Sequence, residues 1–282
     1  MSSPHRHLGT RGVRSLLSIG LAALLAATGL TTLAGGAGAE EPAAAAPALE
    51  RPLAADFPTP TDEIVVHETI LVDEPFDGGN VRYVPGPELG AGDQDEDQLP
   101  VFRVEDGGSL SNVIIGSPGV DGVHCYDSCT LTNVWWENIG EDAATFRGGD
   151  GSQFTVAGGA AVAGDDKVFQ HNGGGTLTVR NFVAEDFATL VRSCGNCSTQ
   201  YQRDIVLDGV EVTVPADRLV GINENYGDTA TLRNVTIVGD SGRDVVPCQR
   251  YIGNDDGDEP DESGADADGT YCRYSASDIT YR

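Results

Sequence analysis

The chain has 282 residues, 44 of them acidic and 17 basic, which gives a formal net charge of −27. This balance excludes nucleic acid as an expected partner, because phosphate binding needs a basic face. It also disfavours a polyanionic ligand unless a cation lies between the two surfaces. An acidic surface is otherwise typical of solubility or salt tolerance.

The first 39 residues have the pattern of a secretory signal peptide. A basic start is followed by an apolar run from Leu16 to Leu30 and by the small residues Ala37-Gly38-Ala39,. The run is too short to be a convincing membrane span, and no later stretch is longer. We therefore predict cleavage after Ala39, secretion to an extracellular location, and no membrane partner.

The rest of the chain divides into a linker and one domain. Residues 40–62 are rich in Ala and Pro, which is typical of an extended linker,. Residues 63–282 are enough for one sizeable core. We expect this domain to be a monomer.

Within the domain, short apolar runs recur and are punctuated by turn residues. Five segments align on positions that are 21, 48, 27 and 26 residues apart, where 48 is close to two units of 24. These positions are Asn112, Asn133, Asn181, Asp208 and Asn234. A period in the twenties with several short strands predicts an all-β, single-domain solenoid. The leucine-rich pattern is missing, so we expect a parallel β-helix, right-handed by the crossover rule. An antiparallel sandwich is the alternative.

Six cysteines in an exported chain favour disulfides over a metal–thiolate site. They fall into three neighbouring pairs, which are Cys125/Cys129, Cys194/Cys197 and Cys248/Cys272. Six cysteines allow fifteen pairings, and the sequence alone does not choose among them. We favour pairing between neighbours.

Several motifs in the domain agree in order and spacing with one known family. They are DGVHCYDSCTLTNVWWENIGEDA, DDKVFQHNGGGTLTVRNF, EDFATLVRSCGNCSTQY and VGINENYGDTATL. In these segments the chain resembles the pectate lyases of polysaccharide lyase family 3, from about residue 63 to 240. The resemblance implies a small right-handed parallel β-helix that is secreted, depends on calcium and cleaves polygalacturonate, or pectin, by β-elimination. The acidic tail after residue 240 is not matched.

Elimination from a uronic acid removes the C5 proton and expels O4. Because calcium on the neighbouring carboxylate would withdraw charge, it would make this proton more acidic. Calcium prefers several oxygen ligands. Asp121 and the adjacent pair Glu141 and Asp142 are separated by about one coil, which places them on neighbouring turns. The resemblance places the family's calcium ligands at these motifs. Asp165 and Asp166 are weaker candidates that could instead hold a lysine in place. The alternative is that Glu141 and Asp142 form a solvated turn.

Lys167 is the only lysine in the chain. The resemblance makes it the catalytic base, because the family's candidate base lies in the matching DKVFQHN stretch. A base must be neutral, and we expect a nearby divalent cation and partial burial to lower its pKa from about 10.4. The alternative is a surface lysine whose stem only covers its neighbours.

Arg192 follows Lys167 by 25 residues, and the resemblance places it at a family active-site arginine. We expect it to bind a substrate carboxylate, with a role as base as the alternative. Three residues earlier, relatives carry a second lysine where this chain has Thr189. The missing cation predicts lower affinity, a shift to partly methylated pectin, or a weak or inactive relative. Asn223 and Tyr226 either line the groove or cap a bend.

Two other functions remain open. A polygalacturonase-type hydrolase needs a pair of carboxylates, which Asp165 and Asp166 could imitate, but the motifs expected of that class are absent. A non-catalytic β-helix that binds acidic polysaccharide is the other, and Thr189 keeps it open.

Overall fold

The computed structural model of this protein describes residues 57–282. The predicted signal peptide, its cleavage site and the linker up to residue 56 lie outside the described residues. Within 57–282 the regular structure is almost entirely strand, with two short 3-10 helices, so the all-β prediction is confirmed. Neither helix in this range is long and apolar enough to span a membrane.

The strands are short and follow one another with brief turns, as the alternating sequence pattern predicts. They are β1 (Glu63–Val66), β2 (Ile70–Val72), β3 (Phe76–Pro85), β4 (Phe102–Val104), β5 (Ser109–Ile115), β6 (Val123–Cys125), β7 (Cys129–Trp136), β8 (Ala144–Phe146), β9 (Gln153–Val162), β10 (Lys167–His171), β11 (Gly175–Arg180), β12 (Val183–Ser193), β13 (Arg203–Asp208), β14 (Glu211–Asn223), β15 (Thr229–Arg233), β16 (Val235–Val238), β17 (Val246–Ile252), β18 (Asp261–Ala265), β19 (Cys272–Arg273) and β20 (Ile279–Tyr281). The 3-10 helices are η1 (Glu224–Tyr226) and η2 (Ala276–Asp278).

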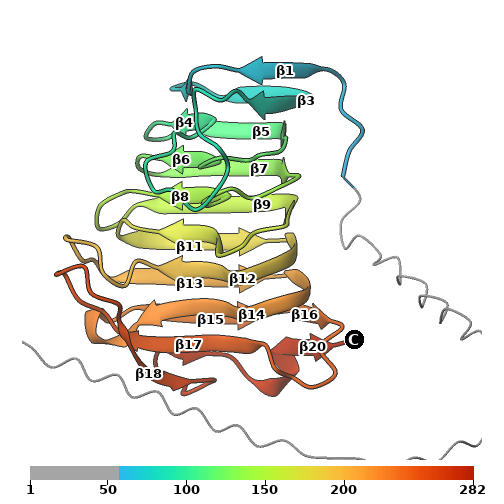
Figure 1. The fold of residues 1–282 in the computed structure, drawn as a ribbon. Coiled ribbons are helices and arrows are strands. Elements are labelled where there is room, and N and C mark those ends of the chain that lie inside the picture. Colours follow the sequence, from blue (N-terminus) through green and yellow to red (C-terminus); the bar gives the residue numbers. More distant parts are fainter. Residues whose placement is uncertain (1–56) are drawn as a thin grey trace, which may run out of the picture. The chain divides into compact units, whose positions relative to one another are not determined.

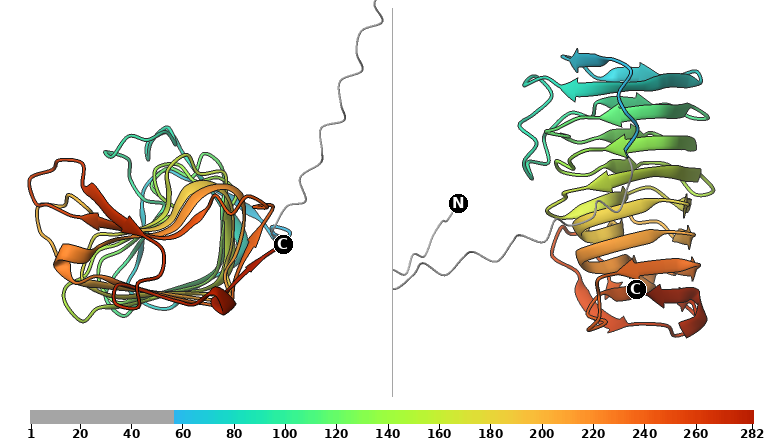
Figure 2. Two further views of the ribbon diagram at one scale, coloured as in Figure 1. Left: turned by 90° about the horizontal axis from the view of Figure 1, so that it is seen from below. Right: turned by 90° about the vertical axis from the view of Figure 1, so that its right-hand side faces the viewer.

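Parallel pairing stacks these strands as successive coils of a β-helix (Figure 1). Each coil contributes strand segments to three faces, and the coils superimpose in the view along their axis (Figure 2). One face consists of β2, β4, β6, β8, β10, β12, β14 and β17, each paired in parallel with the next. We call this face the site sheet. Among the described strands only β17 and β18 pair antiparallel, and the predicted parallel β-helix is confirmed.

The recurring turn residue of the sequence lies at the same corner of successive coils. Asn112, Asn133, Asn181 and Asn234 all have φ between 51° and 52°, the left-handed region that Asn tolerates,. The Asn133 side chain donates to Asn112 Oδ1 at 3.3 Å, so these side chains also stack along the axis. Gly158 fills the interval of 48 residues with φ 69°. After Asn181, the next residue at this corner is Gly209, with φ 71°, and not the predicted Asp208.

Apolar side chains fill the inside of the coil, since alternate residues of each strand point inward. Trp136 is fully buried and makes edge contacts with Phe169 and Phe182. Its neighbour Trp135 points outward and packs against Phe57, with ring centroids 5.6 Å apart.

The three predicted neighbour disulfides are confirmed. They join Cys125 to Cys129, Cys194 to Cys197, and Cys248 to Cys272. The third joins strands β17 and β19, so it closes the acidic segment between these two strands.

Candidate active site

Strand register on the site sheet brings residues from five coils into one line. Val123 pairs with Ala144, and Ala144 pairs with Phe169. Asp121, Asp142 and Lys167 lie two residues before Val123, Ala144 and Phe169, respectively. Lys167 then pairs with Thr189, and Thr189 pairs with Arg218. We call these five residues, from Asp121 to Arg218, the register line; it begins with carboxylates and ends with a guanidinium.

The acidic end of the line is a buried cluster of carboxylates. Asp121, Glu141 and Asp142 are all buried and each offers an oxygen within 4.8 Å of the others. Asp121 Oδ2 is fixed by His124 Nε2 at 2.7 Å, and the Thr145 hydroxyl donates to Asp142 Oδ2 at 3.4 Å. These hydrogen bonds use one oxygen of each aspartate, so Oδ1 of Asp121 and Oδ1 of Asp142 are left for the cluster.

The cluster has the chemistry of a site for a hard divalent cation. Asp121 Oδ1 and Asp142 Oδ1 are buried without a hydrogen-bond partner, although buried carboxylate oxygens are normally satisfied. Burial, and next to it the Glu141 carboxylate, raise the pKa of Asp142 well above its ordinary value, against the lowering effect of Lys167. Three clustered oxygens of this kind fit Ca²⁺, which prefers carboxylate ligands.

Lys167 opens β10 and faces this cluster from the next coil. Its Nζ lies 2.5 Å from Asp166 Oδ2, 3.4 Å from Glu141 Oε1 and 3.7 Å from Asp142 Oδ1. Burial acts to lower the pKa of Lys167, but the three carboxylates together outweigh it and raise the pKa above its ordinary value. These contacts therefore favour the charged ammonium of Lys167, and not the neutral amine that the sequence analysis expects.

Arg192 lies on a second register position of the same sheet, between Gln170 and Gly221. Its guanidinium lies over the ring of Tyr251, with Cζ 3.7 Å from the centroid. The Nη1 atom is buried and has no hydrogen-bond partner, and burial lowers the pKa of Arg192. Tyr251 and Gly221, where an added Cβ would lie 2.9 Å from Arg192 Cδ, therefore hold a guanidinium whose Nη1 has no partner within residues 57–282.

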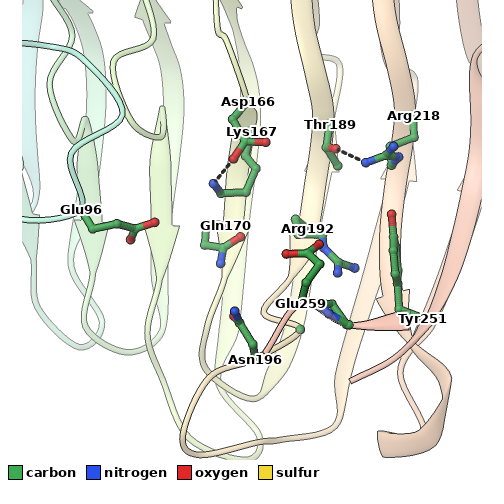
Figure 3. A pocket seen from close by; sticks show the side chains of 12 residues that line it. Glu96, Asp166, Lys167, Gln170, Thr189, Arg192, Asn196, Arg218, Tyr251 and Glu259 are labelled. Atoms are coloured by element: carbon green, nitrogen blue, oxygen red, sulfur yellow. Dashed lines mark hydrogen bonds and ion pairs between the residues drawn. The ribbon is translucent and has the colours of Figure 1, made fainter. Parts of the chain in front are cut away.

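These side chains line one pocket of about 270 Å³ (Figure 3). Lys167, Gln170, Thr189, Arg192 and Arg218 form its floor on the strands of the site sheet. Two segments outside the coils add acidic walls. They are the turn between β3 and β4, which contributes Glu96, and the hairpin between β17 and β18, which contributes Glu259 and Pro260.

The sequence and the fold both match one family. The family model described as pectate lyase matches residues 54–258. The chain belongs to the pectate lyase family. Pectate lyase H of Emericella nidulans is 46% identical over 222 residues, which cover 78% of this chain and 84% of that protein.

Solved structures of pectate lyases share the β-helix. The catalytic domain of pectate lyase PelI from Erwinia chrysanthemi is 30% identical, with a TM-score of 0.66 over 79% of this chain and 98% of that one. PelI in complex with tetragalacturonic acid is similar over 77% of this chain and 70% of that one, also 30% identical, with a TM-score of 0.64. The resemblance to family 3 is therefore confirmed, and membership implies a metal-dependent lyase.

Most of the predicted site residues of this pectate lyase come together, but three do not. Asp165 is exposed, next to the pocket residue Asp166. Asn223 is fully buried and its amide donates to Cys194 O at 2.8 Å, so it braces the coil below the groove. Tyr226 lines a separate hollow beside Tyr201. Neither Asn223 nor Tyr226 is among the residues that line the pocket around Lys167, and their role in the wider groove stays a prediction.

The sequence analysis missed several residues that line the pocket, among them Gln170, Tyr251 and Arg218 on the strands and Glu96 and Glu259 on its walls. Gln170 and Tyr251 carry no charge, so nothing in the chain marked them as groove residues. Arg218 follows Thr189 by 29 residues, more than the spacings of 21 to 25 earlier on the register line. Compared with the interval of 22 residues from Lys167 to Thr189, six of the seven extra residues lie in the connection between β12 and β13, which spans residues 194–202 where the connection between β10 and β11 spans only 172–174. The register shift between Glu185 and Phe187 adds the seventh. A search for cations one coil beyond Thr189 that allowed for a longer connection could have found Arg218.

Proposed function

We propose that this protein is a secreted, calcium-dependent pectate lyase that cleaves polygalacturonate by β-elimination and releases unsaturated oligogalacturonides. The observation that carries the proposal is the register line, on which a buried metal-binding cluster, the lone lysine and the arginine end follow one another on consecutive coils. An acidic substrate needs both features: a cation over the acidic end and positive side chains beyond it.

The acidic cluster would hold the metal, and Asp121, Glu141 and Asp142 are its proposed ligands. Calcium bound there would withdraw charge from a uronate carboxylate and make the adjacent C5 proton more acidic. The cluster also acts on Lys167. Burial is the largest single effect on the pKa of Lys167 and lowers it, while Asp142, Asp166 and Glu141 raise it. A cation bound to Asp142 and Glu141 would offset their raising effect and so would favour the neutral amine.

Lys167 is the proposed base. Its neutral Nζ accepts the proton from C5, the electron pair of that bond forms the C4–C5 double bond, and O4 leaves with the pair of the broken C4–O4 bond. The leaving oxygen takes a proton from solvent. Asp166, 2.5 Å from Nζ, keeps the amine directed into the pocket.

Arg192 is the proposed carboxylate contact at the cationic end. Its unused donors suit a bidentate bond to a uronate, and Tyr251 fixes the plane of the guanidinium. The structural neighbour that binds tetragalacturonic acid supports an oligogalacturonate as the ligand of this groove.

Product analysis tests this proposal. The protein is incubated with de-esterified polygalacturonate and calcium, with and without excess EDTA, and ultraviolet absorbance and reducing ends are both followed. We expect absorbance from the unsaturated ends to rise with calcium and to be absent with EDTA. Reducing ends without absorbance would show a hydrolase, and binding without any new ends would show a non-catalytic protein.

Secretion rests on the N-terminal pattern together with three disulfides, which are typical of exported proteins,. N-terminal sequencing of the protein recovered from the culture medium checks this. We expect a chain that starts at Glu40 and elutes as a monomer; retention of the whole protein inside the cell would contradict it.

A further inference from the structure

Arg218 of β14 occupies the far end of the register line. It pairs with Thr189 of β12, which pairs with Lys167 of β10. Its Nη1 donates to Thr189 Oγ1 at 3.4 Å (Figure 3). Adjacent strands are about 4.8 Å apart, so the guanidinium leans back from its own coil toward the coil between it and Lys167. The place beside Thr189 is thus occupied by a cation that comes from the next coil.

Neither arginine of the pocket is paired with a carboxylate. Among residues 57–282, other arginines facing acids form short ion pairs, such as Arg82 with Glu137 at 2.7 Å and Arg250 with Glu224 at 2.9 Å. No ion pair within 4.0 Å is found in this range for Arg192 or Arg218. Several other arginines in residues 57–282 also lack an ion pair, but Arg192 and Arg218 are the two that line the pocket around Lys167. Their shared place in this pocket, with no carboxylate partner for either, offers a site for an external anion.

The positive charges of Arg192 and Arg218 also repel each other, and a bound anion would reduce this repulsion. Arg218 acts to lower the pKa of Arg192, behind the larger effect of burial, so their charges interact. Glu259 is the carboxylate of the pocket that counteracts this, from the hairpin between β17 and β18. A ligand carboxylate between the two guanidinium groups would relieve the repulsion more directly.

We propose that Arg218 binds a second carboxylate of the uronan, one sugar away from the residue held over Lys167, and that Thr189 is its positioning residue. This inference rests on the proposed function and names a specificity contact within it. One Nη1 hydrogen is taken by Thr189, which fixes the fork, and the remaining donors face the pocket. In this interpretation the positive charge that relatives carry at the position of Thr189 is supplied in this chain by Arg218 of the next coil.

Substitutions at the two partners test the inference. Arg218→Gln removes the charge and keeps a polar side chain, and Arg180→Gln makes the same change on the exposed end of β11, away from the pocket. We expect Arg218→Gln to raise KM for polygalacturonate about 10-fold with kcat changed less than about 2-fold. We expect Arg180→Gln to match the wild type.

A rescue separates a bound carboxylate from a merely structural contact. In the double variant Thr189→Lys with Arg218→Gln, the ammonium stands where the guanidinium of Arg218 now lies. We expect it to recover most of the lost affinity, whereas the double variant Thr189→Val with Arg218→Gln should not. If neither recovers affinity although both melt like the wild type, the positive charge at this place is not what binds, and the inference is overturned.

Binding without turnover distinguishes this inference from the proposed function. Titration calorimetry with tetragalacturonate measures Kd for the wild type, Arg218→Gln and Arg180→Gln. About 10-fold weaker binding by Arg218→Gln alone supports the anion contact, even if no unsaturated product is ever found and the lyase proposal fails. Equal binding by all three overturns the contact, even if the protein is an active lyase. Methyl-esterified oligogalacturonate should show no difference among the three, because it lacks the charge.

Discussion

The two ends of the register line differ in charge although they belong to the same sheet. At the acidic end, Asp121 and Asp142 are buried and directed inward to one cluster with Glu141. At the cationic end, Arg192 and Arg218 are half-buried and have no carboxylate within ion-pair distance in the described chain. Strands of the same sheet carry both ends, so the difference in charge comes from the side chains that these strands place on the register line. One anionic polymer could therefore meet a metal over the first coils and guanidinium groups over the later ones.

Lys167 lies at the boundary between the two ends. It contacts acids on its own coil and on the preceding one, and it pairs in register with Thr189 on the following one. A lysine placed one coil later would lie among cations and would be a binding group. In its actual place it lies against carboxylates of the acidic cluster and against Asp166, and all of them raise its pKa. On the proposed function, a cation bound to the cluster would weaken this effect.

The largest effect is expected when this boundary residue is removed. Lys167→Ala should lower kcat at least about 100-fold, the usual scale for loss of a positioned base, with little change in the binding of tetragalacturonate. Initial rates from ultraviolet absorbance measure kcat, and circular dichroism in calcium checks that the β-helix is intact. A folded Lys167→Ala protein with wild-type turnover would show that another group takes the proton.

Loss of one proposed carboxylate ligand should abolish calcium binding at the acidic end and leave the cationic end unchanged. Calcium at 100 times its Kd stabilises a protein by about 2.7 kcal/mol, so it should raise the melting temperature of the wild type. Asp142→Asn should abolish most of this rise, because it removes a buried carboxylate of the cluster. Asp165→Asn is the matched control on an exposed acid and should keep the full rise. A full rise in Asp142→Asn would place the metal elsewhere.

The acidic end could be predicted from the sequence because its geometry is periodic. Asp121 and Asp142 are 21 residues apart and lie in turns without insertions, so the coil length alone brings them to one place. The corner asparagines could also be predicted from the sequence, because they recur with the coil and each adopts a left-handed φ that few residues tolerate,. Motif resemblance then supplied the roles that spacing could not.

The cationic end could not be predicted in the same way. A long connection between β12 and β13, together with a register shift of one residue between β12 and β14, lengthens the interval from Thr189 to Arg218, which hides the alignment from a count of residues. The contact of Tyr251 with Arg192 joins strands β17 and β12, which are two coils apart. The protonation of Lys167 also escaped prediction, because it depends on the sum of three carboxylate distances against burial.

Removing the aromatic platform should weaken the cationic end moderately. A cation–π contact of a partly desolvated arginine contributes about 1 kcal/mol, so Tyr251→Leu should lower kcat/KM about 5-fold by leaving Arg192 free to tilt. Tyr251→Phe keeps the ring and should stay within about 2-fold of the wild type. Steady-state kinetics on polygalacturonate compares the three. A loss as large in Tyr251→Phe as in Tyr251→Leu would assign the effect to the hydroxyl instead of the ring.

The smallest effect on activity is expected from the uncharged interior below the register line, whose titration changes stability instead. His171 ends β10 and is fully buried, edge-on to Phe154 with centroids 5.4 Å apart. Burial, and next to it the Arg203 guanidinium, lower the pKa of His171 to about 3. The unfolded chain takes up this proton near pH 6.5, and the folded one does not until about pH 3. Stability is therefore unaffected above pH 6.5 and is lost as pH falls below it.

His171→Leu removes this titration while keeping an apolar side chain of similar size. Urea unfolding at pH 7, 6 and 5 gives the free energy of unfolding of both proteins, and their difference isolates His171 from the titration of the carboxylates. Relative to the variant, the wild type should lose about 1 kcal/mol per pH unit below pH 6.5. Parallel curves for the two proteins would mean that His171 is protonated inside the fold, and the interior below the site sheet would then carry charge as its outer face does.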